Sequence, residues 1–209
     1  MAVKIDCGTK FRPGNREALT ALLEGWIKAT AKYSKASGDS EAGYFWGERA
    51  SISILAAGAW LADGVALEEY QTEKTRAGIG QNGRADLYVH IGPSRIGIEA
   101  KHRWTSASWS DDVLQKHLQA CLAEAVSDAK ELGNEVRRYG CVFVVPRFKK
   151  DVASGKEWQA TIEAERERII RLAGPVDAWA WCFPPEAATL EFDDLIYPGA
   201  LVAIQSAEK

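Results

Sequence analysis

Three charged residues in two neighbouring segments of the chain could together support metal-dependent chemistry. Asp86 lies in one segment of alternating apolar and polar residues, and Glu99 and Lys101 lie in the next. Paired carboxylates are the hard oxygen ligands that Mg²⁺ or Mn²⁺ prefers, and the carbonyl of Ala100 would add a further ligand. The metal would hold a phosphate oxygen and activate a water. The lysine would orient or deprotonate that water, or stabilise charge on the phosphate.

The alternation of apolar side chains predicts how these two segments pair as a hairpin. Leu87 and Val89 have odd numbers, whereas Ile96 and Ile98 have even ones. Directly opposed residues share a face of the sheet, so the numbers of an opposed pair must have an odd sum. A two-residue turn at Gly92-Pro93 places Leu87 opposite Ile98. A four-residue loop keeps the faces but shifts the pairing, and a three-residue loop would split the apolar face.

The same register gathers the polar side chains on the other face. It sets Asp86 opposite Glu99 and Arg84 opposite Lys101. The alternative interpretation is a solvated ion pair on an exposed sheet face, because a motif this short also arises by chance. The helices and strands expected around the hairpin are therefore needed to choose between the two interpretations.

Residue periodicity predicts an α/β fold around this hairpin, with a mixed β-sheet in which a three-strand meander is flanked by helices. We expect a single domain over residues 1–209, with a core at about 41–146, an N-terminal helix at 14–33 and an acidic C-terminal addition at 147–209. The further helices are expected at 41–61, 111–132 and 156–173, and the strands at 65–73, 83–91, 95–104, 138–146, 176–183 and 201–204.

These motifs resemble those of a known superfamily of nucleases. The run Gly83-Arg84-Ala85-Asp86, followed thirteen residues later by Glu99-Ala100-Lys101, is similar to the signature of the PD-(D/E)XK, or restriction-endonuclease-like, superfamily. Ala85 stands where the motif name has proline. The core of that family is a helix, a three-strand meander, a helix and a fourth strand. The resemblance implies that Asp86 and Glu99 bind Mg²⁺ or Mn²⁺ and that Lys101 is catalytic.

The family resemblance also implies residues from the two helices beside the meander. A glutamate often comes from the preceding helix, and Glu48 fits that place because it lies one turn before the apolar Ile52. Some branches add a glutamine from the following helix, for which Gln115 and Gln119 are the candidates, Gln115 being preferred. Neither glutamine is followed by tyrosine four residues later.

The charge distribution permits nucleic acid as a partner, although the net charge is −3. Residues 1–150 hold 21 basic against 18 acidic residues, whereas residues 151–209 hold 5 against 11. The glycines at 78–83 do not open a helix, so we interpret them as a loop at the mouth of the site instead of a dinucleotide fingerprint. The residues expected to contact nucleic acid, most simply DNA, are Lys74, Arg76, Arg84, Arg103 and Trp104.

Composition excludes several other classes of protein. Apolar residues make up 46% of the chain, yet the uncharged stretch Ala50–Ala62 is too short to span a membrane. The first residues lack the apolar run of a secretory signal, so we expect a cytoplasmic protein with no membrane partner. The four cysteines form no CxxC pair, which excludes a zinc ribbon or a thioredoxin-type motif.

Two functions follow as hypotheses. The first is a divalent-metal-dependent nuclease that hydrolyses DNA. The second is a catalytically inactive module of the same fold that binds nucleic acid or protein in a phage, mobile-element or defence system. A homodimer is compatible with either.

Overall fold

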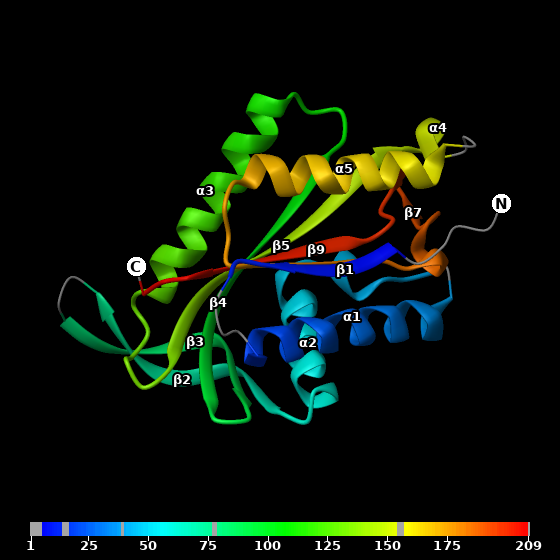
Figure 1. The fold of residues 1–209 in the computed structure, drawn as a ribbon. Coiled ribbons are helices and arrows are strands. Elements are labelled where there is room, and N and C mark those ends of the chain that lie inside the picture. The colour runs from blue at the N-terminus through cyan, green and yellow to red at the C-terminus, as the bar shows by residue number, and fades with distance from the viewer. Residues whose placement is uncertain (1–5, 14–16, 39, 77–78, 154–156, 209) are drawn as a thin grey trace.

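The computed structural model describes residues 6–13, 17–38, 40–76, 79–153 and 157–208. Within these ranges the chain forms an open, mixed nine-stranded sheet with helices on both faces (Figure 1), which confirms the α/β class. The main path of the sheet runs β1-β6-β9-β5-β4-β3-β2. The strands are β1 (Asp6–Phe11), β2 (Val65–Arg76), β3 (Ile79–Ile91), β4 (Ser94–Ser106), β5 (Arg137–Lys149), β6 (Ala178–Phe183), β7 (Glu191–Phe192), β8 (Leu195–Ile196) and β9 (Ala200–Ser206).

Two helical layers cover the two faces of the sheet. In Figure 1 the blue and cyan helices α1 and α2 lie below it, and α3 and α5 lie above it. Side chains of β5 alternate between the layers, so that Phe143 belongs to the lower core and Val142 and Val144 to the upper one. The helices are α1 (Glu17–Ser37), η1 (Gly43–Trp46), α2 (Glu48–Leu61), α3 (Asp111–Ala129), α4 (Lys150–Ala153), α5 (Trp158–Ala173) and η2 (Pro185–Ala187).

The meander β2-β3-β4 has the register that the apolar pattern predicts. Leu87 pairs with Ile98 and Val89 with Ile96, and the ladder closes at Ile91 and Ser94 around a two-residue turn. Strand β4 then continues through α3 into β5, which lies parallel to it. The order helix, three strands, helix, strand is therefore present over residues 48–149.

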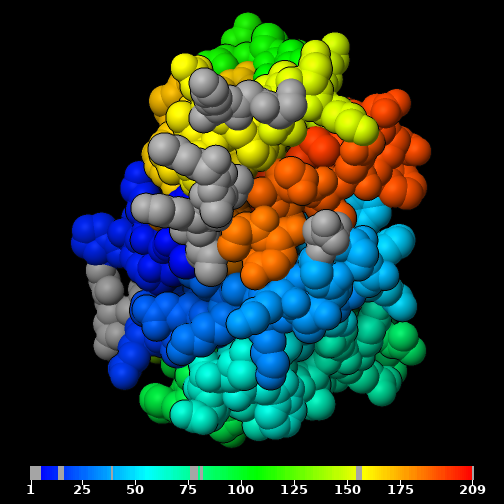
Figure 2. Space-filling view, turned by 90° about the vertical axis from the view of Figure 1, so that its right-hand side faces the viewer, coloured from blue at the N-terminus to red at the C-terminus, as the bar shows by residue number. Residues whose placement is uncertain are grey.

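The acidic C-terminal addition expected at 147–209 contributes two strands, β6 and β9, to the main path of the sheet. Strand β9 pairs with β5, β6 pairs with β9, and the N-terminal β1 completes that edge against β6. Figure 2 shows the orange C-terminal segment packed between the blue α1 and the yellow region of α4 and α5. Both sides of β5 are thus covered by backbone partners.

Several elements differ from the sequence expectations. The first helix begins at Glu17 and extends to Ser37, and the expected helix 41–61 is broken at Gly47 into η1 and α2. Trp60 is exposed although the helical pattern predicts it on the apolar side. Residues 79–83 of the glycine-rich segment belong to β3 instead of forming a loop, and Gly78 lies outside the described residues.

Within the described ranges, no helix is both long and apolar enough to cross a membrane. All four cysteines are free thiols, and Cys121 and Cys141 are buried in the core as their apolar surroundings predict.

Candidate metal-dependent active site

The candidate site lies where β3 and β4 separate, beyond the pair Leu87–Ile98, and we call this point the fork. Their ladder ends at the pair Leu87–Ile98, one pair short of the expected apposition of Asp86 and Glu99. Beyond that point the backbone N–H of Ala100 donates to Oδ2 of Asp86 at 2.7 Å. The carboxylate thus replaces a backbone carbonyl as the partner of β4, which satisfies an N–H that the fork would otherwise leave open.

Glu48 reaches the same edge of β4 from α2, in the helical layer below the sheet in Figure 1. It is the first residue of α2, and its carboxylate lies close enough to the backbone N–H of His102, to Asp86 and to Lys101 for all three to shift its pKa. The N–H groups of residues 100 and 102 point to one side of the strand, so Glu48 and Asp86 lie at the same edge of β4. Gly47 turns the chain between η1 and α2 with a φ of 93°, which side-chain-bearing residues rarely adopt.

Burial and mutual repulsion make these carboxylates weaker acids than usual. Burial raises the pKa of Glu48, and the negative charge of Asp86 raises it further. The pKa of Asp86 is also raised by burial, although the Ala100 N–H, Lys74 and Lys101 all favour its charged form. A further cation bound between Glu48 and Asp86 would relieve the repulsion between these two carboxylates.

Glu99 is the most strongly perturbed carboxylate of the site. Its side chain is 6% exposed, and its Oε1 lies 2.8 Å from the Nζ of Lys74 in β2. Burial raises the pKa of Glu99 to about 7, and the neighbouring Asp86 and Asp128 act in the same direction against the Lys74 ion pair. Glu99 therefore changes its charge near neutral pH in the absence of a metal.

Lys101 is held by two acidic residues of α3. Its Nζ lies 2.7 Å from Oδ2 of Asp128 and 3.5 Å from Oε1 of Glu124. Burial opposes the charge of Lys101, but the hydrogen bond to Asp128 and the charges of Asp128, Glu124 and Glu48 raise its pKa above the ordinary lysine value. The structure thus favours a cationic Lys101, and a lysine held in this way can stabilise negative charge but is poorly suited to removing a proton.

Sequence reasoning missed both of these acidic residues. Glu124 and Asp128 are separated by one helical turn and share the side of α3 that carries the buried Cys121 and Ala125. The sequence feature that could have identified them is a pair of acidic residues, four apart, next to the buried apolar face of that helix.

The two glutamine candidates lie elsewhere on α3. Gln115 precedes Glu124 by nine residues, roughly half a turn around the helix, and is exposed. Gln119 is also exposed and lines a surface pocket with Pro175 and Gln205. The preference for Gln115 is not supported, because α3 is rotated so that acidic residues, and not glutamines, face Lys101.

The structure divides the expected nucleic-acid contacts into buried and exposed groups. The side chain of Lys74 is only 13% exposed and pairs with Glu99, so it is a component of the site and not a surface cation. Arg103 is half-buried beside the Cys121 thiol. Arg84 and Trp104 are exposed, but Trp104 packs on His102, which lies on the opposite face of β4 from Lys101. The side chain of Arg76 lies outside the described residues.

The chemistry of the donor set fits a hard divalent cation, although the ligands are not yet assembled. In the part of the chain that the structure describes, no group of three or more His, Cys, Asp or Glu side chains is placed to hold a metal ion. The ammonium group of Lys74 instead supplies the positive charge beside Glu99. Metal binding here would require Lys74 to move away from that carboxylate.

Comparison with protein-family models, curated proteins and solved structures finds no match to this chain. The geometry of the site therefore carries the functional argument by itself.

Proposed function

We propose that the protein is a divalent-metal-dependent deoxyribonuclease of the PD-(D/E)XK type. The observation that carries the proposal is the convergence on one edge of β4: Asp86 accepts the N–H of Ala100, and the Glu48 carboxylate lies near both the N–H of His102 and Asp86. Glu99 and Lys101 project from the same stretch of the strand. A sheet that opens at this point and fills the gap with carboxylates has the components for cation-assisted chemistry.

The order of elements supports the same proposal. Over residues 48–149 a helix precedes an antiparallel meander, and a second helix leads to a strand parallel to the last strand of the meander. This is the order of the restriction-endonuclease-like core. The motif Asp86…Glu99-Ala100-Lys101 occupies its second and third strands, and Glu48 begins its first helix.

Each residue then has a defined role. Asp86, Glu99 and Glu48, with the carbonyl of Ala100, would hold Mg²⁺ or Mn²⁺. When bound, such an ion polarises a phosphate oxygen and lowers the pKa of an attached water. Lys101, fixed by Asp128, places a positive charge beside the reacting phosphate. The low solvent exposure of Glu99 and Lys101 strengthens these electrostatic effects.

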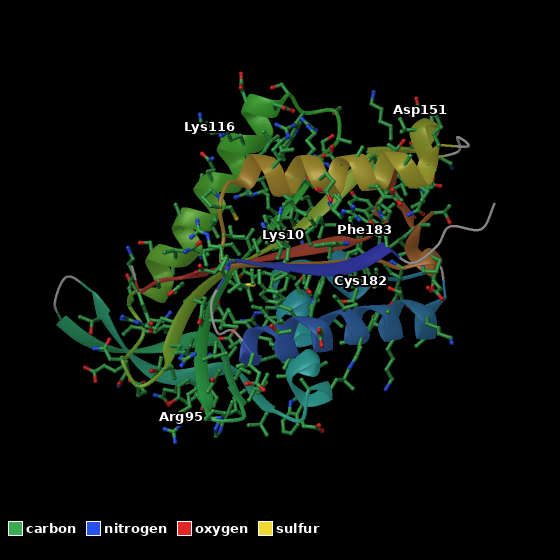
Figure 3. All side chains as sticks on the ribbon, in the orientation of Figure 1. Lys10, Arg95, Lys116, Asp151, Cys182 and Phe183 are labelled. Carbon is green, nitrogen blue, oxygen red and sulfur yellow. The ribbon has the colours of Figure 1, made fainter. Side chains whose placement is uncertain are left out.

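The test is cleavage of plasmid, linear and single-stranded DNA with and without Mn²⁺. We expect metal-dependent cleavage by the wild type and by Lys116→Ala, and cleavage reduced by about 10³-fold in Lys101→Ala and Asp86→Asn. Lys116 is a suitable control because it is an exposed lysine on the outer side of α3, away from the sheet (Figure 3). Equal cleavage by all four proteins would reject the site.

One observation favours a second candidate, a non-catalytic module that binds nucleic acid or protein. Lys74 already pairs with Glu99 and Lys101 with Asp128, so two carboxylates of the site have a cationic partner without a metal. Titration calorimetry with MgCl₂ and MnCl₂ separates the two functions. Heat of binding that disappears in Glu99→Gln supports the nuclease, and the absence of any heat from the wild type supports the module.

A further inference from the structure

A pair of exposed arginines stands beside the carboxylates of the candidate site. Arg49 follows Glu48 at the start of α2, and Arg84 lies on β3 two residues before Asp86. Their side chains are 85% and 70% exposed. Both contact one carboxylate, that of Glu69 in β2, with Arg49 2.9 Å from Oε1 and Arg84 3.7 Å from Oε2.

The backbone of Glu69 is unusual for its residue type. Its φ is 51°, in the left-handed region that favours glycine, although Glu68 and Tyr70 on either side pair normally with β3. The interruption lies directly opposite Asp86, the residue that leaves the β3–β4 ladder. Strained conformations of this kind occur preferentially at functional sites, and here the strain accompanies a side chain aimed between two arginines.

We propose that Arg49 and Arg84 bind a backbone phosphate of the nucleic acid substrate, and that Glu69 occupies the phosphate position in the free protein. A carboxylate with one arginine on each oxygen has the arrangement of a phosphate held by two guanidinium groups. The inference rests on the proposed function, and it adds a substrate-binding subsite and its internal competitor. The arginines also outnumber the acid, which leaves one positive charge next to Glu48 and Asp86.

The salt dependence of DNA binding tests whether the two arginines contact a phosphate. A fluorescein-labelled DNA duplex is titrated in EDTA, so that no cleavage occurs, at several salt concentrations. Arg49→Gln and Arg84→Gln should each weaken binding about tenfold and reduce the salt slope by about one. Arg95→Gln is the matched control, because Arg95 is an exposed arginine at the tip of the β3–β4 hairpin, far from the fork (Figure 3). Loss of affinity no greater than in this control overturns the proposal.

Removing the competitor provides a test with the opposite sign. Glu69→Gln should bind the duplex about three- to fivefold more tightly. Glu68→Gln removes the same charge from the neighbouring residue, which contacts Ser53 instead of an arginine, and should give a smaller gain. In the background of Arg49→Gln with Arg84→Gln, Glu69→Gln should give no gain beyond that of Glu68→Gln.

The outcomes separate this inference from the proposed function. If the wild type cleaves DNA but Glu69→Gln binds no more tightly than Glu68→Gln, the competitor role is wrong and the nuclease stands. If the wild type neither binds the duplex nor cleaves DNA, both proposals fail. Thermal unfolding of each variant identifies any loss of affinity that is due to misfolding, and the two exposed arginines are replaceable without disturbing the core.

Discussion

Two carboxylates in this molecule make the same hydrogen bond in contrasting surroundings. Asp86 and Asp177 each accept a backbone N–H from a neighbouring strand at 2.7 Å, from Ala100 and Ser206 respectively. Asp177 also accepts from the side chain of Gln205 at 3.1 Å. Asp177 has no exposed surface, whereas Asp86 is half-buried.

The neighbours of the two groups differ in sign. Arg12 lies 3.9 Å from Asp177, so donors and a cation surround that carboxylate. Asp86 has cations nearby as well, but Glu48, Glu69 and Glu99 crowd around it. A buried acid with matched donors stabilises the fold, whereas acids that repel one another are a costly arrangement that binding of a cation would relieve. We therefore expect the chemistry to lie at the fork, and Asp177 to contribute to the stability of the fold.

The largest expected effect comes from Asp86→Asn. Asparagine still accepts the Ala100 N–H, so the fork should keep its geometry while losing a negative charge. DNA cleavage in Mn²⁺ should fall by about 10³-fold. The free energy of unfolding should change by less than about 1 kcal/mol. A denaturant titration run alongside the cleavage assay checks both, and retained cleavage would remove Asp86 from the site.

Asp177→Ala should behave in the opposite way. It leaves the N–H of Ser206 and the amide of Gln205 without their carboxylate partner in a buried position, which should cost about 2–4 kcal/mol of unfolding free energy. The folded fraction should still cleave DNA at the wild-type rate per molecule. A stable variant with impaired cleavage would contradict the division between the two regions.

The pH dependence of stability should isolate Glu99. Because burial raises its folded-state pKa to about 7, the folded protein binds a proton more tightly than the unfolded chain does. The contribution of Glu99 is therefore present in full at acidic pH, below the ordinary glutamate value, and is lost as pH rises through 7. Without metal, stability should fall by about 1–2 kcal/mol between pH 5 and 8.

Glu99→Gln is the control for that dependence and should flatten the profile in the same interval. Mn²⁺ should raise the melting temperature of the wild type more at pH 8 than at pH 5.5, because the metal competes with the proton for this carboxylate. A wild-type profile that matches Glu99→Gln at every pH would show that Glu99 does not titrate in this range.

The smallest expected effect is that of Asp128→Asn. Lys101 would keep its charge but lose its strongest ion pair, so cleavage should fall only about three- to tenfold. The loss should appear in kcat and leave KM unchanged, because Asp128 acts through Lys101. A loss as large as that of Lys101→Ala would indicate that Asp128 has a direct part in the chemistry.

Local patterns in the sequence were sufficient to predict the hairpin, its register and its turn. The alternation of Leu87 and Val89 with Ile96 and Ile98 leaves one register with a two-residue turn, because slipping by one residue would expose the apolar face. The same register predicts Asp86 opposite Glu99, but the ladder ends one pair earlier and the Asp86 side chain accepts the Ala100 N–H instead. Glu48 was located by the family resemblance and the helical phase.

Local patterns do not predict ion-pair partners that come from elements distant in the sequence. Lys74, which we expected to contact nucleic acid, pairs with Glu99. Gln115, the preferred glutamine candidate, is exposed, and the α3 residues that contact Lys101 are Asp128 and Glu124. The rotation of α3 about its axis and the path of β2 past the fork depend on packing across the whole sheet. The sequence by itself thus determined which side chains share the hairpin, through the two-residue period of a strand. Only the tertiary structure decided which charges neutralise them, because those contacts join residues that no local period relates.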